Sequence, residues 1–190
     1  MLLAVACVVA VLSPLIAGRW PAGLLLHRWR LPWLVWVTLL VQGLALTAPL
    51  PRGLVAVLHV ATYGLALGFL WINRQIPGVP LVGLGAASNA VGIAVNGGVL
   101  PVSPAAAAAA GRTHREGFSN AAVLEEPLLP WLGDVVAWPA PLPLANTASV
   151  GDVLVLLGVL LAAWSSTRRL GRSAAPPEAH EPRSGEVTAR

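Results

Sequence analysis

The polar residues that could do chemistry in this sequence stand in mostly apolar surroundings. They are Asn89, Asn96, Asp134, Asp152 and His59. Asp134 and Asp152 each lie within a Gly-Asp-Val triplet. Two carboxylates about 5 to 10 Å apart can act as an acid and base pair. Amide and imidazole side chains can line a path for a ligand or ion, or they can join helices by hydrogen bonds.

Each of these residues also has a structural interpretation, which we favour. Ser149-Val150-Gly151-Asp152 matches a capping box, in which Ser149 caps a helix and the Asp152 carboxylate returns to the Ser149 N–H. For Asp134 we expect an exposed, solvated or helix-capping carboxylate. His59 is expected to be a core histidine whose ring is satisfied by hydrogen bonds. For Asn89 and Asn96 we expect hydrogen bonds between helices.

A metal site is the remaining chemical alternative. It would combine Asp134 with His114, Glu116, Glu125 and Glu126. No HExxH or other ligand spacing supports it, and no phosphate loop, nucleophile elbow or dinucleotide fingerprint occurs. We therefore predict no metal, no cofactor and no catalytic residue.

The composition favours lipid as the solvent for much of the chain. Apolar residues make up 56% of the 190 residues and charged residues 11%, and the mean hydropathy is +0.74. A soluble domain could not bury that much apolar surface. Cys7 is the only cysteine, so no disulfide can form within one chain.

We predict an all-α membrane protein of about five transmembrane helices, because five apolar segments approach the length of about 20 residues that crosses a bilayer core. The segments are 2–17, 31–48, 54–72, 79–95 and 150–164. Together they form a single membrane domain, 1–165. Residues 97–149 form one long outer loop, and the polar tail 166–190 should be disordered.

Local patterns predict how these segments pack. Gly85, Asn89, Gly92 and Asn96 fall on one face of the 79–95 helix, which should pack against another helix. Gly64-x-x-x-Gly68 has the small-residue spacing that permits close packing.

The long loop should hold structure of its own. Ser103-Pro104, a run of six alanines and Gly111 predict a short helix there. Residues 128–138 are apolar but too few to span, so we expect them to lie in the membrane interface.

Arginines set the expected orientation. With five spans, nine arginines fall on one side and three on the other, and lysine is absent. Basic residues gather on the cytoplasmic side of short loops. We therefore expect an outside N-terminus, an outward-facing long loop and a cytoplasmic C-terminal tail in a bacterial inner membrane.

Five motifs carry a family resemblance. They are the segment Asn89–Asn96, Gly97-Gly98-Val99-Leu100-Pro101, Gly117-Phe118-Ser119-Asn120, Trp131-Leu132-Gly133-Asp134 and Ser149-Val150-Gly151-Asp152. Residues 1 to about 165 resemble the DUF5317 family of bacterial membrane proteins of unknown function. The resemblance implies a multi-spanning fold and supplies no activity, so no functional residue is carried over.

The favoured function is a non-enzymatic scaffold or accessory protein, since packing and capping explain the polar residues. Its partners would be the lipid bilayer and other membrane proteins, with no nucleic acid. The alternative is binding or transport of a small molecule or lipid through a polar cavity beneath the outer loop, lined by Asn89, Asn96, Asp152 and His59.

Overall fold

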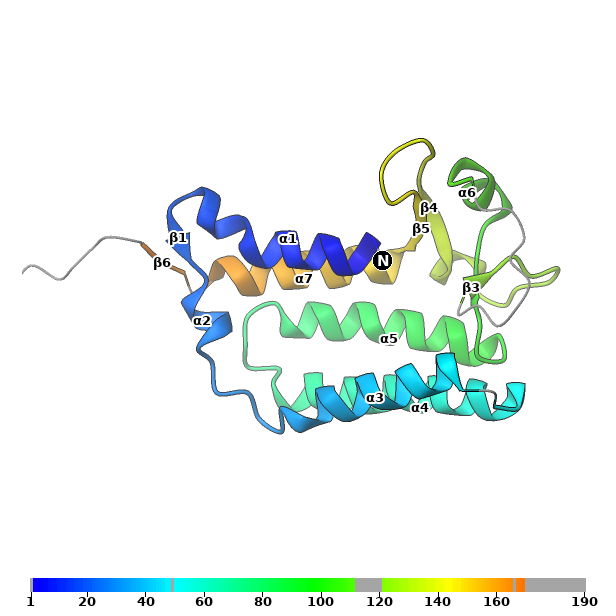
Figure 1. The fold of residues 1–190 in the computed structure, drawn as a ribbon, viewed down its shortest axis with the longest axis horizontal. Coiled ribbons are helices and arrows are strands. Elements are labelled where there is room, and N and C mark those ends of the chain that lie inside the picture. The colour runs from blue at the N-terminus through cyan, green and yellow to red at the C-terminus, as the bar shows by residue number, and fades with distance from the viewer. Residues whose placement is uncertain (1, 49, 112–120, 166, 170–190) are drawn as a thin grey trace, which may run out of the picture.

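Five helices lie side by side and hold just over half of the described residues (Figure 1). In this computed structural model, residues 2–48, 50–111, 121–165 and 167–169 are described. The helices are α1 (Leu2–Ile16), α3 (Trp33–Thr47), α4 (Arg52–Ile72), α5 (Val79–Val95) and α7 (Val150–Ser165). Each begins and ends within two residues of a segment that hydropathy predicted.

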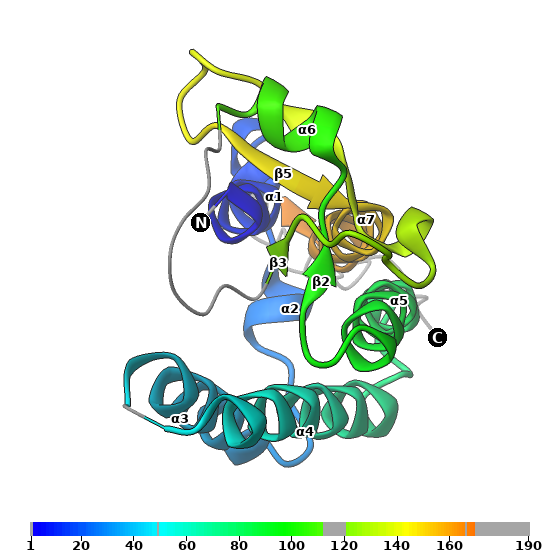
Figure 2. The ribbon, with the colours of Figure 1, turned by 90° about the vertical axis from the view of Figure 1, so that its right-hand side faces the viewer.

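The helices pack as a row rather than in sequence order. The last helix, α7, lies between α1 and α5, and α4 lies between α5 and α3. Figure 2 shows the row from one end, with α1 and α7 above α5 and with α3 and α4 below it. The row therefore places α1 beside α7, the two described long helices that are farthest apart in the sequence.

The row has two different ends. At one end, which we call the arginine end, β1 (Arg19–Trp20) pairs antiparallel with β6 (Arg168–Arg169), and the short helix α2 (Ala22–Leu25) follows β1. The α4–α5 turn also lies there (Figure 1). At the other end lies the outer module, which we define as residues 97–149.

Short elements build the outer module. The short helix expected after Ser103 is present as α6 (Pro104–Ala109), although Ser103 makes no side-chain capping bond. β2 (Leu100–Pro101) pairs parallel with β3 (Ala121–Ala122). A 3₁₀ turn, η1 (Pro130–Leu132), leads into β4 (Asp134–Trp138), which pairs antiparallel with β5 (Asn146–Ser149).

The β4–β5 hairpin corrects the all-α expectation, since the fold is mostly helical with short paired strands. β4 carries Val135 and Val136, whose branched side chains favour strands, and it is completed by a partner about ten residues further along the chain. The segment 128–138, expected as an apolar stretch in the membrane interface, therefore contains a 3₁₀ turn and a strand. A strand that depends on pairing is not visible in hydropathy alone.

Two glycine pairs bring α5 and α7 into backbone contact. Gly85 faces Gly151, and Gly78 faces Gly158. A move of seven residues forward, from Gly78 into α5, thus corresponds to a move of seven residues backward in α7. The two helices are therefore antiparallel. A methyl group on Gly158 would lie 2.6 Å from the Val82 nitrogen and 2.7 Å from the Gly78 oxygen. Only glycine permits this approach.

The expected close packing at Gly64 and Gly68 of α4 is wrong. A Cβ on either glycine would meet no atom of the described residues within 4 Å. The small-residue spacing on α4 therefore does not mark a close helix contact. The close contact lies between α5 and α7 instead.

Many large apolar side chains of the described helices are exposed, while small residues supply much of the buried interior. Ala10, Ala45, Ala162 and Ala163 are buried, together with a few larger residues such as Ile93. Trp36 is 72% exposed. Exposed apolar patches on soluble proteins are usually limited.

Five full spans are not supported by helix length. Among the described helices, only the segment Gly53–Ile72 of α4 is long and apolar enough to cross a membrane. The apolar parts of the other four are 17 residues or shorter. At about 1.5 Å per residue they fall short of a hydrocarbon core of about 30 Å. The segments predicted from hydropathy were already about this short, and counting each of them as a full span was the error.

The prediction of a disordered tail from residue 166 is wrong for residues 168–169, which form β6. The rest of the tail, from residue 170 on, lies outside the described residues.

The glycine contacts predict an asymmetric response to added methyl groups. Gly85→Ala should lower the free energy of unfolding by about 1–3 kcal/mol, because the methyl would overlap the Gly151 carbonyl and push α7 away. Gly64→Ala is the matched control and should leave stability unchanged or slightly higher, since alanine favours helix. Thermal unfolding in detergent measures both variants. Equal melting temperatures would contradict the close α5–α7 contact.

Candidate functional site

The α5–α7 contact ends in a cluster of polar side chains where β5 turns into α7. Ser149 and Asp152 form the predicted capping box: Ser149 Oγ accepts a hydrogen bond from the Asp152 N–H (2.9 Å), and Asp152 Oδ2 accepts one from the Ser149 N–H (3.1 Å). These bonds satisfy N–H groups that the first turn of a helix leaves free. The capping interpretation of Asp152 is confirmed.

Asn89 of α5 completes this cluster from the neighbouring helix. Its Nδ2 donates to Asp152 Oδ1 (2.9 Å), and its Oδ1 accepts from Ser149 Oγ (2.8 Å). Ser149 is fully buried and Asn89 is 7% exposed. The missing side chain of Gly151 makes room for the Asn89 amide. The expected hydrogen bond between helices is therefore present at Asn89.

Asp134 lies on the strand opposite this cluster. It faces Ser149 in the register of β4 and β5, and its Oδ2 accepts a 2.6 Å hydrogen bond from Thr147 Oγ1. Only 5% of Asp134 is exposed. The expectation of an exposed or helix-capping carboxylate is wrong, because β4 turns this side chain inward against β5. Asp134 and Asp152 thus approach the same residue, Ser149, from two elements.

Asn96 joins α5 to the outer module rather than to a helix. At the C-terminal end of α5 its Nδ2 donates to the carbonyls of Gly92 (2.7 Å) and Leu128 (2.8 Å), and its Oδ1 accepts from the Leu128 N–H (2.8 Å). The stripe predicted on α5 is therefore divided: Gly85 and Asn89 face α7, while Gly92 and Asn96 face Leu132 and Leu128 of the module.

Asn73 repeats this arrangement at the arginine end, and the sequence reasoning missed it. At the end of α4 its Nδ2 donates to the carbonyls of Phe69 (2.9 Å) and Arg30 (3.0 Å), and its Oδ1 accepts from the Arg30 N–H (2.9 Å). Each asparagine caps its own helix through the residue four positions earlier and clamps both backbone groups of a distant residue. We call these two contacts the asparagine clamps. An asparagine just after a long apolar helix was the available signal.

His59 belongs to a separate cluster between α3 and α4. Its Nδ1 lies 2.7 Å from Gln42 Nε2, and Thr62 Oγ1 donates to Gln42 Oε1 (2.8 Å). The Tyr63 ring packs edge-on against the imidazole at 5.5 Å. His59 and Thr62 are each 3% exposed. This environment agrees with a core histidine that joins two helices.

The described residues do not assemble the metal site considered from the sequence. No three His, Cys, Asp or Glu side chains within the described ranges are close enough to hold an ion. Glu125 and Glu126 are exposed, and His114 and Glu116 lie outside the described residues.

The cluster around Ser149 joins three elements by hydrogen bonds. Both oxygens of Asp152 accept hydrogen bonds, one from Asn89 and one from the backbone that begins α7. Asp134 is buried and bound by Thr147. The geometry fixes where α7, β5 and β4 meet.

The comparisons with known proteins give one match. The model of a family described as "Family of unknown function (DUF5317)" matches residues 27–164. This range covers more than two thirds of the chain and includes Asn89, Asn96, Asp134 and Asp152, while α1 lies before it. No curated protein and no solved structure is significantly similar to the chain.

Removal of the Asn89 amide should destabilise the protein. Asn89→Leu leaves the Ser149 hydroxyl and one Asp152 oxygen without their buried partner, which costs about 1–3 kcal/mol. Thermal unfolding in detergent should show a melting temperature lower by several degrees. Val91→Leu on the exposed face of the same helix is the control and should unfold like the parent. A melting temperature unchanged by Asn89→Leu would point to a ligand-binding amide instead.

Proposed function

Because this chain belongs to the DUF5317 family of unknown function, its role has to be argued from its structure, and we propose that it is a non-enzymatic membrane scaffold. In this proposal all five long helices sit in the bacterial inner membrane, and the outer module is held rigidly on the outside. Other membrane proteins would bind that module.

The observation that carries the membrane part is the exposure of large apolar side chains along the helices, as with Trp36 and Val57. Several alanines and glycines lie between the helices. Helices that associate in lipid use small residues for close backbone contact, because lipid gives no hydrophobic drive toward a large-residue core. Short helices can be accommodated by local thinning of the bilayer.

Charge distribution supports one direction of insertion. The described arginines of β1, β6, the α2–α3 connection and the α4–α5 turn all belong to the arginine end (Figure 1). The described carboxylates, Glu125, Glu126, Asp134 and Asp152, belong to the outer module and to the helix end beneath it. The positive-inside rule then gives a cytoplasmic arginine end and an outside N-terminus.

Two features of the outer module support a scaffold. It is fixed to the helices by the asparagine clamp at Leu128 and by the Asn89–Ser149–Asp152 bonds. It also exposes large apolar side chains, including Trp131 (62%) and Val136 (47%). A rigid platform with exposed aromatic and aliphatic residues suits protein binding. The alternative ligand path would need the Asn89 and Asp152 polar atoms free, whereas they bind one another.

The membrane orientation can be measured by cysteine labelling. In a Cys7→Ala background, Glu126→Cys places a single thiol on the outer module and Gln75→Cys places one at the arginine end. A membrane-impermeant maleimide added to spheroplasts should label the first variant directly and the second only after permeabilisation. The reverse pattern would overturn the orientation. A chain recovered without detergent in the soluble fraction would overturn membrane insertion itself.

The scaffold role predicts a specific neighbour at the hairpin. A photocrosslinking amino acid at position 136, next to the exposed Trp138, should yield one discrete protein adduct in cells. Trp138→Ser should reduce that adduct several-fold, because a buried tryptophan commonly dominates a protein interface. The same crosslinker at position 57, which is 65% exposed on α4, is the matched control and should give no discrete protein adduct. No adduct at position 136, or equal adducts at both positions, would contradict the proposal.

A further inference from the structure

An apolar groove of about 400 Å³ runs between α1 and α4 in the half of the helix row nearest the arginine end. Its walls come from four of the long helices, and its lining is hydrocarbon or aromatic apart from the Cys7 thiol. Val8, Val11, Phe69, Val82 and Val159 are among the lining residues. These side chains offer no polar group to a ligand, so the groove suits a hydrocarbon chain.

The segment after β1 closes the groove at the arginine end. Leu24 of α2 and Trp29 line it, and Trp29 stacks on Phe69 of α4 with ring centroids 5.6 Å apart. Figures 1 and 2 both show α2 between α1 above and the α3–α4 pair below. The asparagine clamp of Asn73 on Arg30 holds the end of this segment in place.

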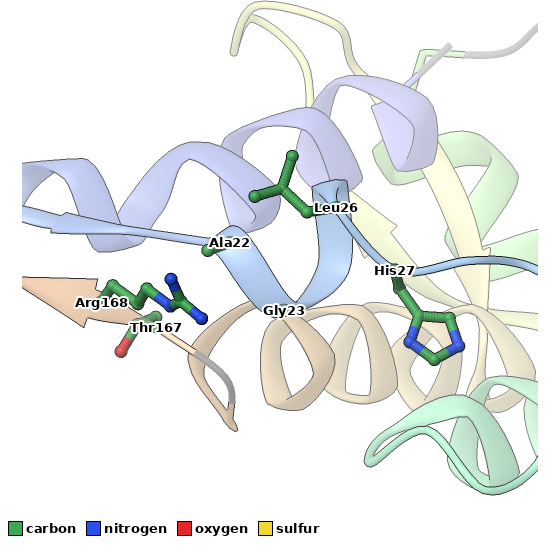
Figure 3. Close-up of a pocket in the computed structure, with 6 residues that line it drawn as sticks. All are labelled: Ala22, Gly23, Leu26, His27, Thr167 and Arg168. Carbon is green, nitrogen blue, oxygen red and sulfur yellow. The ribbon is translucent and has the colours of Figure 1, made fainter.

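A second cavity, of about 460 Å³, lies on the same short segment. It is lined by Ala22, Gly23, Leu26, His27, Thr167 and Arg168. Figure 3 shows His27 extending from the connection after α2, with the Arg168 guanidinium on the opposite side of Gly23. Unlike the groove, this cavity offers a cation, an imidazole and a hydroxyl. Residues 22–29 therefore border an apolar space and a cationic one.

The surroundings of the cationic cavity favour an anion. The arginines of this end whose side chains are described are Arg19, Arg28, Arg30, Arg74 and Arg168. All the described carboxylates belong to the other end of the row. Arginine binds phosphate well, because its planar guanidinium presents several donors. A phosphate group at this end meets attraction without competition from a described carboxylate.

We propose that the groove and the cavity together bind one anionic phospholipid, with an acyl chain in the groove and the phosphate near Arg168 and His27. This inference rests on the proposed membrane insertion and adds a defined lipid site to it. The extent of the groove favours a lipid over a further helix. The groove lining begins near the middle of α1 and ends at α2, so the length of the groove matches one leaflet of a bilayer. A further spanning helix would have to run along the full length of the helix row, where α2 would block it.

Native mass spectrometry of the full chain in mild detergent tests the site. The probes are phosphatidylglycerol and phosphatidylcholine with identical chains, added at equal concentration, and inorganic phosphate added alone. The parent should retain one phosphatidylglycerol in preference to phosphatidylcholine. Arg168→Gln should lower that preference about fivefold, the effect of one basic residue at an anionic headgroup. Arg52→Gln, at the opposite end of the helix row, is the matched control and should keep the preference for phosphatidylglycerol.

A second pair of variants tests the groove. Val11→Trp should fill it and reduce retention of both lipids, and Leu12→Trp, at another lining position, serves if the first variant fails to fold. Leu40→Trp adds the same side chain on the outside of α3 and should change nothing. Melting temperatures without lipid verify the fold of each variant.

Three results would overturn the lipid site in a protein that still requires detergent. They are equal retention of phosphatidylglycerol and phosphatidylcholine by the parent, unchanged lipid retention in both Val11→Trp and Leu12→Trp, and binding of inorganic phosphate as tight as that of phosphatidylglycerol. A dimer that Val11→Trp dissociates would likewise assign the groove to a second copy. A chain that is soluble without detergent would instead refute the membrane proposal.

Discussion

The close approach of α5 and α7 is the contact on which the rest of the structure depends. Gly85 of α5 and Gly78, which directly precedes α5, meet Gly151 and Gly158 of α7, so backbone touches backbone. Because Gly151 has no side chain, the Asn89 amide can reach Ser149 and Asp152. The packing of small residues and the polar cluster are therefore parts of one arrangement.

That contact also fixes the outer module. Ser149 ends β5 and caps α7, so the direction of the hairpin follows from the position of the helix. Asn96, two turns beyond Asn89 on the same helix, clamps Leu128 at the other side of the module. A single helix, α5, thus holds both the hairpin and the segment that leads into it.

Sequence reasoning succeeded where the signal is local. Apolar length located the helices, and the Ser149–Asp152 spacing identified a capping box that the structure contains. It failed where the decisive partner is distant. The environment of Asp134 depends on β5, and the role of Asn73 depends on Arg30, which lies 43 residues earlier. The Gly64–Gly68 spacing was misleading for the same reason, since spacing does not say which helix will lie alongside.

The position of α1 has a consequence for biosynthesis. Its partner α7 is synthesised more than 130 residues after it, and the two are joined by the β1–β6 pair and by a hydrogen bond from Trp164 to Ser13. The hairpin of α3 and α4 and its neighbour α5 can assemble while translation continues. α1 must therefore wait, without its native neighbour, until α7 has been synthesised.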